Sequence, residues 1–355
     1  MSLYDYNGNL IGGSVKSVRP TDGAEHFTVK IKKADLSVNT GTTGIQDSMT
    51  EYTDSGVIFI PESYTVDGTP TRLIISCHGS GTVIDDSFGI TTKTWNNFLY
   101  QMGYAIMDVN GGADDSRHFG APFAIQSYIK AYQYVVDKYN LYPEVFVLGG
   151  SMGGLPAFTL AQCGAIPVKA LAGFCPVVDL LRQAWMNPWY GGASGEAWGT
   201  QRKLIAEYFN FADYDTFSGW TNAKTPSETE MQYFLDNADK WQGYNPMTCG
   251  AVNGDSILTT ATSDYADLYG SLIKTHKVPT KIWQSDADPT VSCEFGKYIV
   301  SAIKKSGGIA YHRRYPSGGH TPGWGDTVTV TNEKGKTVSG YSNEIECYYW
   351  FKRWE

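Results

Sequence analysis

The sequence predicts an α/β protein whose core is a mostly parallel β-sheet covered by helices. Short apolar runs of strand length alternate with stretches in which apolar residues recur every three or four positions. Since neighbouring parallel strands must be joined by crossover segments, this alternation favours a parallel sheet. The buried-strand run at residues 145–148 also leads directly into a glycine-rich turn and then a helical stretch at residues 155–163.

Length and charge narrow the class of protein. A chain of 355 residues can bury a large core, and we expect a single domain over residues 1–355. The net charge of −8 argues against a nucleic-acid partner, because phosphates require a basic face. The sequence has no apolar run long enough to span a bilayer, so no membrane partner is expected. The polar first residues lack the pattern of a signal peptide; a cytoplasmic location is favoured, with a phage-associated or secreted one left open.

The six cysteines do not indicate a metal centre. They form no C-x-x-C pair, so zinc and dithiol chemistry lack support, and we expect neither metal nor cofactor. Cys77, Cys163 and Cys175 lie in apolar runs and are predicted to be small buried thiols.

The elements follow one another in a regular order. Residues 27–33 and 56–61 are predicted as edge strands that open the sheet. The helical stripe at residues 123–139 is ended by Asn140 and Pro143. Further strands are expected at residues 71–77, 104–109, 168–177, 280–284 and 309–315, and further helices at residues 291–305 and 344–354.

Two insertions interrupt this order. Residues 179–278 contain no clean strand–helix unit and are rich in tryptophan, so we expect a mainly helical lid over the carboxyl edge of the sheet, where ligands of such sheets bind. Residues 327–339 have the pattern of a β-hairpin.

Gly149-x-Ser151-x-Gly153 is the first motif that carries chemistry. Glycine has no Cβ, so the backbone can cross itself closely and leave the serine on a strained turn with its hydroxyl exposed. The pattern by itself is weak, and the alternative is a glycine-rich turn that packs a helix on a strand. In its strand–turn–helix context it predicts a nucleophile that attacks an ester or amide carbonyl.

A serine nucleophile needs a base and an acid that orients the base. His320 follows the last predicted strand in a glycine-rich loop and is the predicted base, with His118 as the serious rival. Asp288 follows the strand at residues 280–284 and is the predicted acid, although an aspartate there could simply cap the next helix. Asp286 and Asp179 remain as alternatives for the acid.

The oxyanion of the reaction needs two aimed donors. The backbone N–H of Met152 is one candidate, because it lies at the start of the helix that follows the nucleophile. The second is expected from His78-Gly-Ser-Gly81, with the Ser80 N–H favoured and Gly79 as the alternative.

Together these motifs resemble the α/β-hydrolase superfamily, in which the triad follows the chain order Ser, Asp, His. They are most similar to its esterases of the acetyl-xylan, feruloyl and polyhydroxybutyrate-depolymerase type. The resemblance covers nearly the whole chain from about Val57. It implies a central, mostly parallel sheet of about eight strands, a Ser151–His320–Asp288 triad and no metal. Two features depart from the family pattern: His78-Gly-Ser-Gly81 is not a full H-G-G-G, and the aromatic insertion is larger than in minimal esterases.

The expected activity is therefore cleavage of carboxylic esters through an acyl-enzyme, on acylated carbohydrate or on small esters. Trp185, Trp189 and Trp324, together with Trp198, are candidates to line the acyl or sugar pocket, with ordinary packing as the alternative. A peptidase of the prolyl-oligopeptidase type and a catalytically silent binding module are the rival functions. The oligomeric state cannot be predicted from these motifs.

Overall fold

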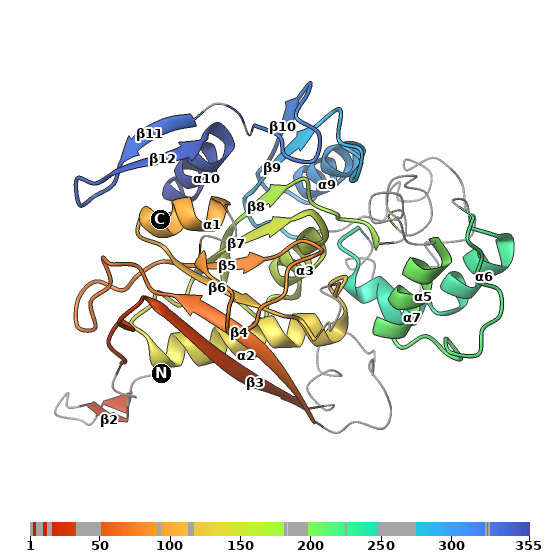
Figure 1. The fold of residues 1–355 in the computed structure, drawn as a ribbon, viewed down its shortest axis with the longest axis horizontal. Coiled ribbons are helices and arrows are strands. Elements are labelled where there is room, and N and C mark those ends of the chain that lie inside the picture. The colour runs from red at the N-terminus through yellow and green to blue at the C-terminus, as the bar shows by residue number, and fades with distance from the viewer. Residues whose placement is uncertain are drawn as a thin grey trace.

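An eight-stranded sheet forms the centre of the computed structural model (Figure 1). The structure describes residues 3–4, 10–12, 16–32, 51–90, 94–112, 117–180, 183, 198–223, 226–247, 275–323, 325 and 327–355. The strand order is β10-β9-β8-β7-β5-β6-β4-β3. The strands are β3 (Ala24–Lys32), β4 (Glu51–Phe59), β5 (Leu73–Cys77), β6 (Ala105–Val109), β7 (Val145–Gly150), β8 (Val168–Phe174), β9 (Thr280–Ser285) and β10 (Ala310–Tyr315).

The pairing confirms the predicted mostly parallel sheet. From β6 through β10 every neighbouring pair is parallel, whereas β4 runs antiparallel to both β6 and β3. The predicted pair of edge strands corresponds to β3 and β4, of which only β3 lies at the edge. The central strands β5, β6 and β7 are buried along their whole length, as expected for strands covered on both faces.

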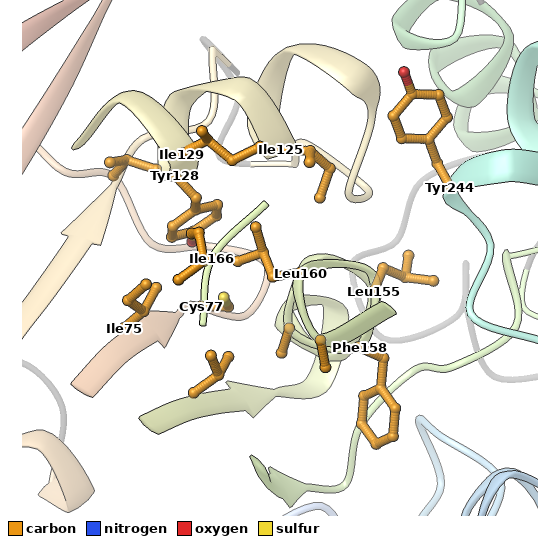
Figure 2. Packing of buried hydrophobic residues seen from close by; sticks show 14 of the residues in the cluster. Ile75, Cys77, Ile125, Tyr128, Ile129, Leu155, Phe158, Leu160, Ile166 and Tyr244 are labelled. Carbon is orange, nitrogen blue, oxygen red and sulfur yellow. The ribbon is translucent and has the colours of Figure 1, made fainter. Parts of the chain in front are cut away.

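Helices cover both faces of the sheet. The helices of the sheet body are α1 (Thr94–Gln101), α2 (Pro122–Lys138), α3 (Gly154–Cys163), α9 (Glu294–Lys305) and α10 (Ser342–Lys352). Buried side chains of α2, α3 and α9 form one apolar layer with the sheet, and those of α1 and α10 form the other. Within the first layer, Ile75 and Cys77 of β5 share the core with Tyr128 of α2 and Leu155 and Leu160 of α3 (Figure 2).

The described parts of the insertion between β8 and β9 contain short helices joined by turns and irregular segments. Its helices are α5 (Trp198–Tyr208), α6 (Glu228–Asp236) and α7 (Ala238–Trp241), followed by the 3₁₀ turn η4 (Gln242–Tyr244). They lie to one side of the sheet (Figure 1). Trp241 is fully buried and its Nε1 donates a hydrogen bond to the Phe234 carbonyl at 3.0 Å, so this tryptophan packs inside the insertion. The role of the insertion as a lid stays a prediction.

Two small antiparallel pairs complete the structure. Strands β11 (Thr327–Thr331) and β12 (Thr337–Tyr341) pair at the place where the sequence predicts a hairpin. Strands β1 (Leu3–Tyr4) and β2 (Leu10–Gly12) form the other pair. Among the helices that the structure describes, none combines the length and apolar character that a bilayer crossing requires.

Candidate active site

Ser151 lies on a strained turn at the carboxyl end of β7. Its backbone φ is +53°, a left-handed conformation that costs a non-glycine residue roughly 1–2 kcal/mol. The chain enters helix α3 three residues later, after a short 3₁₀ turn over Ser151–Gly153. The carbonyl oxygen of Ser151 accepts a hydrogen bond from the Val177 N–H at 2.8 Å, so the turn is also tied to the loop after β8.

Glycines make this turn possible because other chain segments pass too close for a side chain. A Cβ atom on Gly153 would lie 1.9 Å from the Cys77 carbonyl oxygen, and one on Gly149 would lie 2.6 Å from the Gly153 carbonyl oxygen. Both contacts are far shorter than atoms tolerate, so a larger residue would force the helix away from the strand. The motif is therefore a packing requirement that also presents the serine.

His320 and Asp288 lie together at the same edge of the sheet. The His320 Nδ1 atom is 2.8 Å from Oδ2 of Asp288. Asp288 follows β9 and His320 follows β10, which is parallel to β9, so the two loops emerge side by side. The Asp288 side chain is fully buried, whereas the His320 side chain is 31% exposed.

Asp288 is held as a carboxylate by its neighbours. Its Oδ1 atom accepts hydrogen bonds from the backbone N–H groups of Thr290 and Val291, at 2.7 and 3.0 Å. Burial alone would raise the pKa of the Asp288 carboxyl, but the His320 contact and the two backbone donors lower it below its ordinary value. A carboxylate in this position fixes the tautomer of the facing imidazole and leaves Nε2 as the nitrogen that can take a proton.

The rival residues are engaged elsewhere. His118 is fully buried, and its Nδ1 accepts a hydrogen bond from the Gly120 N–H at 3.1 Å. Burial and the neighbouring His78 ring lower the pKa of His118 well below its usual value. Asp286 pairs with Arg314 at 2.7 Å near the surface, and Asp179 accepts a hydrogen bond from the Asn245 amide at 3.2 Å. Each of these aspartates therefore has a partner other than His320.

The predicted oxyanion segment lies against the nucleophile. A Cβ built on Gly79 would be 3.2 Å from the Ser151 Cβ and 3.2 Å from the Gly150 carbonyl oxygen. Ser80 is exposed, and Gly81 follows it with φ at +84°. Met152 lies in the 3₁₀ turn directly after Ser151, where backbone N–H groups at the start of a helix have no acceptor within it.

Sequence reasoning treated Cys175 only as a buried thiol, and the structure places it beside the His–Asp pair. Its Sγ, an oxygen of Asp288 and a nitrogen of His320 lie within 4.8 Å of one another. These residue types could hold a metal ion, but a metal-bound cysteine is a thiolate. Burial and the adjacent Asp288 raise the pKa of the Cys175 thiol well above its usual value, so the thiol is protonated beside the carboxylate. No signal in the sequence indicated this, because Cys175 lies inside the strand predicted at residues 168–177, whereas β8 (Val168–Phe174) ends just before it.

Three predicted pocket residues lie outside the described residues: Trp185, Trp189 and Trp324. The side chain of Trp198 is not described either. Their place in the site therefore stays a prediction.

Comparison with known proteins identifies the fold. A scan against protein-family models found no match, and neither did a search of curated proteins. Among solved structures, lipase A from Candida antarctica aligns with a TM-score of 0.54 at 12% identity, over 84% of this chain and 74% of that one. A protein assigned as a dipeptidyl aminopeptidase IV from Bacteroides ovatus aligns with a TM-score of 0.50 at 13% identity, over 94% of this chain and 36% of that one.

A puromycin hydrolase is also similar, with a TM-score of 0.49 at 15% identity, over 76% of this chain and 34% of that one. The chain thus spans about a third of the puromycin hydrolase and of the aminopeptidase, and about three quarters of the lipase. At these identities the likeness concerns the fold. The mostly parallel eight-stranded sheet with helices on both faces is the α/β-hydrolase fold.

Proposed function

We propose that this protein is a serine hydrolase that cleaves carboxylic esters. One observation carries the proposal: a buried aspartate holds a partly exposed histidine at 2.8 Å, at the sheet edge where a strained serine turn also ends. Serine, aspartate and histidine occur in the chain order that this fold uses for its triad.

In the proposed mechanism, the Ser151 hydroxyl attacks the ester carbonyl while His320 Nε2 takes its proton. Asp288 keeps the imidazole in the right tautomer and stabilises the imidazolium. The Met152 and Ser80 N–H groups hold the tetrahedral oxyanion. His320 then protonates the departing alcohol, and a water molecule repeats the sequence on the acyl-enzyme to release the acid and free Ser151.

The wild-type protein should hydrolyse p-nitrophenyl acetate and react with a fluorophosphonate probe at Ser151. The variant Ser151→Ala should lose about 10³-fold or more in kcat and should not be labelled. Mass spectrometry locates the label. An unchanged rate in Ser151→Ala would overturn the proposal, and an unlabelled, inactive wild-type protein would favour the silent binding module.

A peptidase is the second candidate, supported by the fold match to the aminopeptidase over 94% of this chain. We favour the ester because this chain matches the lipase over most of both lengths. Paired assays with p-nitrophenyl acetate and a dipeptide p-nitroanilide decide between the two. A higher kcat/KM for the anilide would establish the peptidase.

Within the esters, we propose acylated carbohydrates or small esters as substrates. Support comes from the many tryptophans in and after the insertion, since indole rings stack on sugar rings. Acetate release from acetylated xylan, compared with release from p-nitrophenyl acetate, tests this narrower proposal. Absence of any release from the polysaccharide would leave small esters as the substrates.

A further inference from the structure

The Cys175 thiol lies within the proposed catalytic cluster. It lies in the turn that follows β8 and is only 1% exposed. Its Sγ lies within 4.8 Å of an oxygen of Asp288 and of a nitrogen of His320. An ionised carboxylate can only accept hydrogen bonds, so a thiol in this place can serve it only as a donor.

The thiol is placed where it could complete the hydrogen bonding of a buried charge. An ionised carboxylate has about four positions at which it can accept a hydrogen bond. In Asp288, Thr290 and Val291 donate to Oδ1, and His320 lies against Oδ2. The Cys175 Sγ is a further polar atom close to this carboxylate, within 4.8 Å.

The backbone at Cys175 has a strained conformation. Its φ is +45°, a left-handed conformation that glycine adopts freely and a residue with a Cβ does not. A glycine would relieve the strain but would carry no donor. A side chain held in a disfavoured backbone conformation at a functional site indicates that the side chain has a task there.

The turn that contains Cys175 is hydrogen-bonded to the segments on either side of it. The Cys175 N–H donates to the Trp283 carbonyl on β9 at 2.8 Å, and the Val177 N–H donates to the Ser151 carbonyl at 2.8 Å. A Cβ on Gly154 would lie 2.5 Å from the Val177 carbonyl oxygen, so the turn also packs tightly on α3. The thiol therefore sits at a fixed place between the serine turn and the strand that carries Asp288.

We propose that Cys175 is a positioning residue for the hydrolase reaction. In this role its thiol donates a hydrogen bond to the Asp288 carboxylate. That bond holds the carboxylate in the orientation that His320 needs and takes up part of the negative charge that would otherwise face the imidazole. This inference rests on the proposed function. Among the described residues, the titratable groups that face the thiol are Asp288 and His320, while Asp286 on the same loop is paired with Arg314.

The test compares Cys175→Ala, which removes the donor, with Cys175→Ser, which keeps one. Loss of one hydrogen bond should lower kcat for p-nitrophenyl acetate about fivefold in Cys175→Ala. It should also move the acid limb of the pH–rate profile upward by about half a pH unit, since the carboxylate then holds the imidazole proton more tightly. Cys175→Ser should restore both quantities. Cys163→Ala, which removes a half-buried thiol at the end of α3, is the matched control and should change neither.

A second measurement does not require activity. The low-field proton resonance of the His320 Nδ1–H group, assigned by its loss in His320→Gln, should shift in Cys175→Ala and return toward its wild-type position in Cys175→Ser. If wild type does not hydrolyse esters but the resonance shifts as described, the proposed function fails and the positioning contact stands. If both variants lose activity equally with an unmoved acid limb, or if Cys175→Ala matches wild type in all three readouts, the inference is overturned.

Discussion

Ser151 and Cys175, at the carboxyl ends of neighbouring strands, both have a positive φ, a conformation that is strained for residues other than glycine. In each residue the strained backbone positions a polar side-chain atom. In Ser151 it is the hydroxyl of the proposed nucleophile, and in Cys175 it is the thiol beside Asp288. The first was predictable, because the flanking glycines mark the turn. The second was not, because Cys175 stands in an apolar run that gives no sign of its φ angle or of the carboxylate it meets.

The two aspartates of one loop should differ sharply when changed to asparagine. Asp288→Asn should lower kcat for p-nitrophenyl acetate by about 10³–10⁴-fold, because an amide cannot stabilise the imidazolium and can hold the wrong tautomer. Asp286→Asn removes only a pair with Arg314 near the surface and should change kcat by less than about twofold. Steady-state kinetics near pH 8 check both. The reverse ranking would show that Asp286 is the acid.

At the scale of elements, the turn between β7 and α3 depends on glycines that lie directly against the backbone of other segments. Gly153→Ala should cost about 3 kcal/mol or more in the free energy of unfolding and should also reduce activity, because the added Cβ meets the Cys77 carbonyl. Gly164→Ala, at the other end of α3, is the control. Its φ is +68° but the space around it is open, so it should cost only about 1 kcal/mol and leave kcat unchanged. Urea unfolding and ester hydrolysis give the two readouts.

Helix α10 begins with a buried carboxyl, Glu344, whose Oε2 accepts a hydrogen bond from the Tyr341 N–H at 2.7 Å. Burial raises the pKa of Glu344 to about 7, although the Tyr341 bond opposes this. A raised carboxyl pKa stabilises the fold fully below the unfolded value near 4.5, and that contribution is lost as the pH rises to about 7.

Glu344→Gln keeps the acceptor and removes the ionisation. It should therefore leave the melting temperature unchanged at pH 4 and raise the stability by up to about 3 kcal/mol at pH 8. Thermal unfolding across this range checks the expectation. Equal effects at both pH values would show that the carboxyl is not the titrating group.

At the scale of the whole molecule, three histidines should make the fold sensitive to acid. Burial lowers the pKa of His118 well below its usual value and the pKa of His276 and His312 to about 4. A depressed histidine pKa gives stability that is complete above the unfolded value of 6.5 and is lost as the pH falls toward the folded value.

The free energy of unfolding should thus fall between pH 6.5 and about 4.5, before most carboxylates are protonated. The Glu344→Gln background is the right one for this measurement, since Glu344 opposes the histidines in the same range. Adding His276→Gln should reduce the slope by about one proton. A slope that does not change would mean that His276 is already neutral in the unfolded state or charged in the folded one.

The sequence alone determined the α/β class, the position of the serine turn and the types of residue at three strand ends, because these follow from local patterns: apolar periodicity, glycine spacing and chain order. Tertiary structure decided which aspartate meets His320, that His118 is buried away from this role, and that Cys175 joins the cluster. The physical reason is that these contacts join loops far apart in the chain. The order and register of the parallel strands set which loops lie side by side, and no local pattern encodes that distance.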